Sequence, residues 1–169
     1  MPGKRKRPSA STTPPPAIAS DRILHYAVLD DTVGYTKGHG LLFVDGEEIG
    51  RVPLLAICQS RNESEVVLYF CEKGWNSLAV SVHDSVANAK RRAERIYPGS
   101  SKCWEESHVT EEEVAQHLDR MYKDFRCSFC GKRGDLVGQM FAGNGDAQIC
   151  DECVAEFNAG LANPPTQSD

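Results

Sequence analysis

The segment 127-CSFCGKRGDLVGQMFAGNGDAQICDECV-154 decides the fold of the C-terminal part of this chain. It contains two Cys-x-x-Cys pairs separated by nineteen residues: Cys127, Cys130, Cys150 and Cys153. Two residues between cysteines let a tight turn direct both sulfurs at one ion. Two such turns complete a closed tetrahedral site with Zn–S distances of about 2.3 Å. The sequence therefore predicts that these four cysteines bind one Zn²⁺ ion.

Four thiolates fill the coordination sphere of zinc and leave no position for an activated water, so the predicted site is structural and not catalytic. In a module of about 35 residues, the metal must supply most of the folding free energy. Two alternatives remain open from the residues alone. Four thiolates also hold iron–sulfur clusters, and a redox Cys-x-x-Cys would need only one pair.

The chain has seven cysteines, so three lie outside the paired motif: Cys58, Cys71 and Cys103. In a reducing compartment, paired Cys-x-x-Cys units indicate a metal site and not disulfides. We interpret the other three cysteines as small buried or half-buried hydrophobic residues.

The pieces RCSFCGK and ICDECV, with an apolar strand-like piece and an AG turn between them, resemble the zinc-binding domain of the ClpX family. The resemblance covers roughly residues 125–161, about a fifth of the chain. It implies a treble-clef-like C4 zinc finger with the four cysteines as ligands. In that family the domain dimerises, binds substrates and adaptor proteins, and does not catalyse.

The resemblance also implies which apolar residues of the finger face a protein partner or a second copy of the chain. These are Phe129, Leu136, Met140, Phe141 and Phe157. The chain departs from the family in having no G-x-x-x-x-G-K-[ST] loop, so we expect no nucleotide binding.

Residues 1–20 are basic and then rich in Ser, Thr and Pro, which predicts a disordered tail. Short β-type runs in residues 21–100 predict an antiparallel meander of four or five strands, with tight turns at Asp45-Gly46 and Lys73-Gly74. A helix capped by Asp84 or Ser85 and stopped at Pro98-Gly99 follows the strands. The fold class is therefore α+β, with one helix packed on the meander.

We assign residues 101–124 to a linker and a second helix. The helix begins in a capping box of Thr110 and Glu113, and the run EEEVAQHLDRMYKDF extends it to residue 125, the first residue of the finger. The finger then covers residues 125–161. A short disordered tail, 162–169, follows it.

The net charge is −5, and residues 101–169 hold thirteen acids against six bases. Acidic surroundings disfavour phosphate binding. Together with the closed four-cysteine site and what the ClpX resemblance implies, this charge leads us to predict a non-enzymatic protein-interaction module. We expect it to be cytoplasmic and to have no membrane span. The alternative is a nucleic-acid-binding regulator that uses the basic tail and the cationic side of the first helix: Lys90, Arg91, Arg92 and Arg95. The five histidines are scattered and match no catalytic motif.

Overall fold

The structure is a computed structural model that describes residues 12–38, 43–44, 47–48, 50–60 and 64–162. The chain divides between Val114 and Ala115 into two compact units. Each unit is described by itself.

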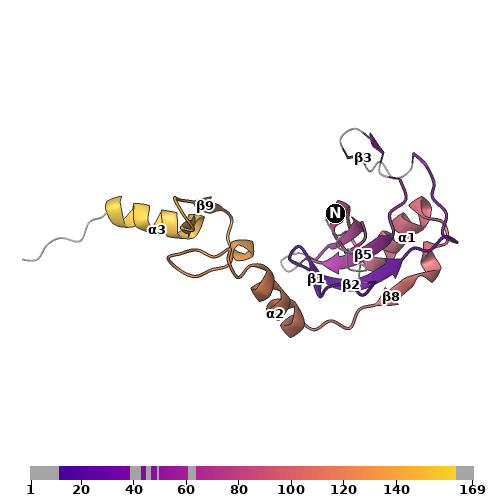
Figure 1. The fold of residues 1–169 in the computed structure, drawn as a ribbon, viewed down its shortest axis with the longest axis horizontal. Coiled ribbons are helices and arrows are strands. Elements are labelled where there is room, and N and C mark those ends of the chain that lie inside the picture. The colour runs from indigo at the N-terminus through magenta and orange to yellow at the C-terminus, as the bar shows by residue number, and fades with distance from the viewer. Residues whose placement is uncertain (1–11, 39–42, 45–46, 49, 61–63, 163–169) are drawn as a thin grey trace, which may run out of the picture. The chain divides into compact units, whose positions relative to one another are not determined.

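The first unit is built on an antiparallel sheet (Figure 1). Its main path is β1 (Ala17–Ile18), β2 (Asp21–Val28), β5 (Leu54–Gln59), β6 (Val66–Cys71) and β7 (Ser77–His83), in that order. A sixth strand, β8 (Trp104–Glu106), pairs with the second half of β2, whereas β1 pairs with its first two residues. The two short strands β1 and β8 thus pair with different parts of β2.

The central strands β5, up to its last residue Gln59, and β6 consist of apolar and aromatic residues, as expected where both faces of a sheet are covered. Their register places Leu55 opposite Phe70 and Ile57 opposite Leu68, and all four side chains are buried. Between β6 and β7, Gly74 has a φ of 95°, which glycine adopts without strain. The predicted turn at Lys73-Gly74 is therefore confirmed.

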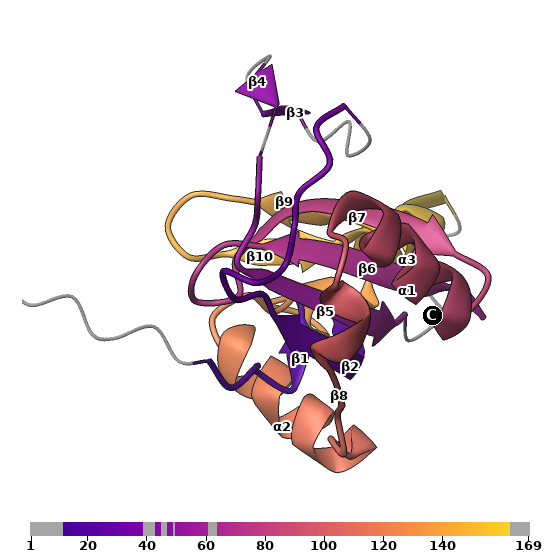
Figure 2. The same cartoon turned by 90° about the vertical axis from the view of Figure 1, so that its right-hand side faces the viewer.

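Helix α1 (Val86–Ile96) lies over one face of the sheet, against β6 and β7 (Figure 2). The Ser85 side chain caps it by accepting a hydrogen bond from the N–H of Asn88. Ala89, Ala93 and Ile96 recur at steps of four and three residues and bury the helix against the sheet. The predicted α+β class and the packed helix are confirmed.

Two of the unpaired cysteines lie in a second apolar cluster, on the opposite face of the sheet. Cys58 and Cys71 are fully buried, and burial raises the pKa of both thiols, that of Cys71 to about 12. Cys103 is half-buried beside the first core. The three residues act as small hydrophobic groups, as the sequence indicated.

Two sequence boundaries need correction. The tail predicted to reach residue 20 ends earlier, because Ala17 and Ile18 form β1 and are buried. The predicted linker begins with a 3₁₀ turn, η1 (Ser100–Lys102), and then forms β8, which gains its hydrogen bonds from the distant β2. Strands β3 (Phe43–Val44) and β4 (Glu47–Glu48) pair with each other, and the turn predicted at residues 45–46 lies outside the described residues.

Helix α2 (Glu111–Met121) begins in the predicted capping box. The N–H of Glu113 donates to Thr110 Oγ1 at 3.2 Å, and the N–H of Thr110 donates to Glu113 Oε2 at 2.8 Å. The helix ends at Met121, four residues before the predicted end. There the chain turns, with the N–H of Phe125 bonded to the carbonyl of Tyr122.

The second unit continues through a 3₁₀ turn, a two-stranded hairpin and a helix. They are η2 (Gly134–Leu136), β9 (Met140–Ala142), β10 (Gln148–Cys150) and α3 (Asp151–Ala162). A cysteine turn, a hairpin and a helix follow one another as the treble-clef expectation requires. Over the part of the chain that is described, no helix combines the length and apolar character needed to span a membrane.

Candidate metal centre

The four cysteines of the paired motif converge on one point. Their Sγ atoms all lie within 4.8 Å of one another. The separations Cys127–Cys153 and Cys130–Cys150 are both 3.7 Å between sulfurs. A regular tetrahedron with Zn–S bonds of about 2.3 Å has edges of about 3.8 Å. The sulfurs are therefore spaced as ligands of a single ion.

A tight turn positions the first pair of ligands. The N–H of Gly131 donates to the carbonyl of Cys127 at 2.9 Å, and the N–H of Cys127 donates to the carbonyl of Lys132 at 2.9 Å. Gly131 has a φ of 74°, so this position needs the freedom of glycine. The turn brings Cys130 back beside Cys127.

The second pair spans the junction between β10 and α3. Cys150 is the last residue of the strand, and Cys153 lies in the first turn of the helix. The N–H of Cys153 donates to Cys150 Sγ, and the N–H of Cys150 donates to Cys127 Sγ, each at 3.4 Å. Such N–H groups stabilise thiolate charge and orient the sulfurs, the usual task of groups around a metal site.

The electrostatics of the cluster are compatible with a bound cation. Burial raises the pKa of the Cys127 thiol, but backbone N–H donors led by those of Cys130 and Cys150 outweigh it and lower the pKa to about 6. Burial and the neighbouring sulfurs raise the pKa of Cys153. Adjacent thiolates repel one another, and a positive ion between the sulfurs would offset this repulsion.

The donor set fits one structural Zn²⁺ ion. Four thiolates at this spacing enclose a single ion, whereas a cluster of several irons and sulfides would hold the cysteines farther apart. Of the four cysteines, three are buried and only Cys130 is exposed. Val137, Met140 and Ile149 pack against the buried sulfurs. The ligands close the site, so the finger is a non-catalytic module.

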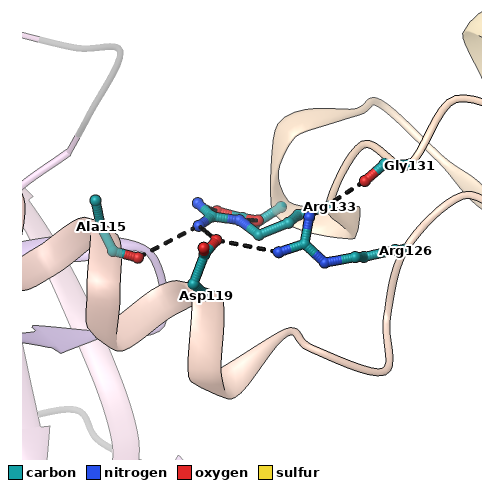
Figure 3. Close-up of polar contacts among 6 residues, drawn as sticks. Ala115, Asp119, Arg126, Gly131 and Arg133 are labelled. Carbon is teal, nitrogen blue, oxygen red and sulfur yellow. Dashed lines mark hydrogen bonds and ion pairs between the residues drawn. The ribbon is translucent and has the colours of Figure 1, made fainter.

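A buried arginine ties α2 to the finger. Arg133 donates from Nη1 to Asp119 Oδ1 at 2.6 Å and to the carbonyl of Ala115 at 3.5 Å (Figure 3). Its Nε and Nη2 donate to the two carboxylate oxygens of Asp135 at 2.9 and 3.1 Å. The side chains of Arg133 and Asp135 are 7% and 2% exposed. The sequence reasoning missed this pair because a lone Arg-x-Asp resembles solvated surface charge.

The five predicted partner-binding residues differ in their exposure and in their contacts. Phe129 and Phe157 meet edge to face, with ring centroids 5.2 Å apart, and are 62% and 49% exposed. Leu136 and Phe141 are also exposed. Met140 is half-buried against the cysteine cluster.

The sequence reasoning did not select two exposed residues of α3 that extend the aromatic pair. Val154 and Leu161 stand three residues before and four residues after Phe157, which places all three on one side of the helix. This spacing in the letters VAEFNAGL was the available signal. We call Phe129, Val154, Phe157 and Leu161 together the finger surface.

The cationic residues of the alternative hypothesis separate into two groups in the first unit. Lys90 Nζ lies 5.6 Å from the ring centroid of Trp104 and 3.3 Å from His25 Nδ1. Arg91, Arg92 and Arg95 instead line a hollow on α1.

Comparisons with known proteins agree with the metal centre. Residues 125–163 match the family model of the ClpX C4-type zinc finger. The chain is 49% identical over 35 residues to the ATP-dependent Clp protease ATP-binding subunit ClpX 2 of Wolinella succinogenes. The aligned segment is 21% of this chain and 9% of that protein, so the chain spans less than a tenth of the length of this relative. No solved structure matches the chain.

The predicted resemblance to a ClpX-type zinc finger is thus confirmed for the C-terminal segment, together with one structural Zn²⁺ ion. The family model does not reach the sheet-based unit.

Proposed function

We propose that this protein is a zinc-stabilised interaction module that binds other proteins, and a second copy of itself, through the finger surface. The observation that carries the proposal is the exposed aromatic pair of Phe129 and Phe157, extended along α3 by Val154 and Leu161. Apolar side chains gathered on a surface are typical of interaction sites.

Burial of the finger surface against a partner would favour association. Burying a Phe, Val or Leu side chain contributes about 1.5–3 kcal/mol when its full area is removed from water. These side chains are already partly covered, with exposed fractions from 41% for Val154 to 81% for Leu161. Aromatic residues packed in the centre of an interface often supply most of its binding energy.

The metal would give this surface its shape. Phe129 lies between the first two ligands, and Val154 follows the fourth ligand directly. The zinc ion therefore fixes the two halves of the finger surface relative to each other. Binding through the surface should require the metal, although the metal itself would contact no partner.

The acidic charge of residues 101–169 and the cysteine ligands indicate what kind of partner and which cellular location to expect. Residues 101–169 hold thirteen acids and six bases, which favours a partner that is neutral or basic around an apolar segment. Unfolded or adaptor proteins with exposed apolar segments fit this description. Cysteine ligands escape oxidation to disulfides in a reducing compartment, so we propose a cytoplasmic location.

Substituting Phe157 tests the proposal. We expect the zinc-loaded wild-type chain to show twice the 18.6 kDa chain mass in light scattering at tens of micromolar (an order-of-magnitude choice for transient dimers). Phe157→Glu should give the single-chain mass. It should also lower the affinity for a chemically unfolded model protein by about tenfold or more.

Met121→Glu is the matched control, because Met121 is 68% exposed near the end of α2 and lies outside the finger surface. It should behave as wild type in both assays. A wild-type monomer would refute self-association. Equal binding of the unfolded protein by wild type and Phe157→Glu would refute the finger surface as the site of protein binding.

A further inference from the structure

A hollow of about 300 Å³ lies in the first unit, beside α1 and the end of β7. Its lining is almost entirely basic or amide: His83, Asn88, Arg91, Arg92 and Arg95. It is distinct from the zinc centre and from the finger surface.

The lining side chains from α1 lie together because of their spacing along the helix. Asn88, Arg92 and Arg95 stand at steps of four and three residues, so they share one side of α1. Arg91 joins them by donating a hydrogen bond to the Asn88 side chain. His83 ends β7, and its Nε2 lies 2.8 Å from Ser81 Oγ.

The effects on the His83 pKa agree with this arrangement. Burial and then the charge of Arg92 lower the pKa of His83, and Asp84 opposes them. His83 therefore lies within the electrostatic reach of Arg92.

Among the residues that the structure describes, no carboxylate forms an ion pair within 4.0 Å with the three arginines of the hollow. Asp84 is the acid that acts on the neighbouring His83. The one acid of α1, Glu94, accepts hydrogen bonds from the N–H groups of Gly99 at 2.8 Å and Ser101 at 2.7 Å. Its carboxylate binds the turn after the helix and forms no ion pair with the three arginines.

We propose that this hollow binds a single phosphate monoester group, carried by a small molecule or by a phosphorylated side chain. Guanidinium groups present paired N–H donors that match phosphate oxygens, and a dianion offsets the mutual repulsion of neighbouring arginines. The amide of Asn88 adds a neutral polar group at the rim.

The surroundings favour one phosphate group over a nucleic-acid backbone. A backbone-tracking groove needs cations along several successive phosphates. Here the arginines occupy less than two turns of one helix, and residues 20–100 hold eleven acids against nine bases. Lys90, the remaining base of α1 in this run, is turned to Trp104 and His25.

Nitrogen-15 NMR titrations of the zinc-loaded full chain test this site with inorganic phosphate and O-phosphoserine, and with serine as the analogue that lacks the phosphate group. Both phosphates should give saturable shifts at the Arg91, Arg92 and Arg95 side chains, and serine should give none. A lower dissociation constant for phosphoserine than for inorganic phosphate would indicate that the natural ligand is a phosphorylated side chain. Equal dissociation constants would indicate a free phosphate compound. Arg92→Gln should weaken phosphate binding by about tenfold or more.

Two further variants separate the effect of charge from the effect of paired hydrogen-bond donors. The NMR spectrum of each variant also shows whether the sheet remains folded. Lys90→Gln removes the same charge from the same helix and should change affinity less than about twofold. Arg92→Lys keeps the charge but loses the paired donors, so it should fall between wild type and Arg92→Gln.

Four outcomes would overturn the site. They are an absence of saturable shifts, equal shifts with serine, equal losses in Lys90→Gln and Arg92→Gln, and salt-dependent RNA binding without phosphoserine binding.

Discussion

At the scale of single residues, Arg133 is the buried one of two arginines that join α2 to the finger. Its bidentate pair with Asp135 is nearly buried, whereas Asp119 is 63% exposed. A buried charge that loses its partner is costly, because the remaining charge keeps its desolvation penalty. The partially exposed pair of Arg126 and Asp119, at 3.1 Å, is screened by water and contributes much less.

Arg133→Gln should therefore lower the free energy of unfolding of the second unit by about 3 kcal/mol. Arg126→Gln, which removes the same charge at a more exposed position, should lower it by less than about 1 kcal/mol. Urea titrations of the zinc-loaded chain, followed by exchange of amides in α2 and the finger, measure both. Equal losses in the two variants would show that burial of Arg133 does not determine its contribution.

The sequence alone predicts the role of some single residues but not of others. The four cysteines follow from spacing alone, since metal geometry leaves few other arrangements. The burial of Arg133 depends on elements that are distant in sequence. The letters GKRGD contain no sign of it.

At the scale of elements, the capping box of α2 is a local device whose effect is separable from the metal. Thr110 and Glu113 satisfy each other's N–H groups at the start of the helix. Thr110→Ala should lower the free energy of unfolding of α2 by about 1 kcal/mol.

Glu113→Gln keeps an acceptor for the Thr110 N–H and should cost less than half as much as Thr110→Ala. Amide exchange in α2 under native conditions gives both values. If Thr110→Ala leaves these exchange rates unchanged, the box does not set the start of the helix.

The elements also show which structures sequence patterns can predict. The strands β5 and β6, the cap of α1 and the start of α2 follow from local patterns of apolar and capping residues. Strands β1 and β8 do not, because each has two or three residues and exists only by pairing with β2. Helix α2 was expected to continue to residue 125, but the turn before Arg126 ends it at Met121.

At the scale of the whole molecule, the chain combines two compact units with different sources of stability. The sheet-based unit has two apolar clusters, one on each face of its sheet. The finger has a small cluster formed by three of its own cysteines and a few apolar neighbours. A core of that size does not offset the conformational entropy of folding, so the finger depends on its metal. The sequence predicted the zinc finger and its family but left the role of the sheet-based unit open.

The most direct measurement of the central claim is hydrogen exchange of the full chain in the Cys150→Ser variant, compared with wild type and with Cys103→Ser. Removing one of four ligands should abolish protection in residues 126–154 while β5 and β6 keep theirs, because the metal organises only the second unit. Cys103→Ser, outside the metal site, should match wild type. Retained protection in the finger of Cys150→Ser would contradict a structural zinc site, and loss of protection throughout the chain would contradict two independently stabilised units.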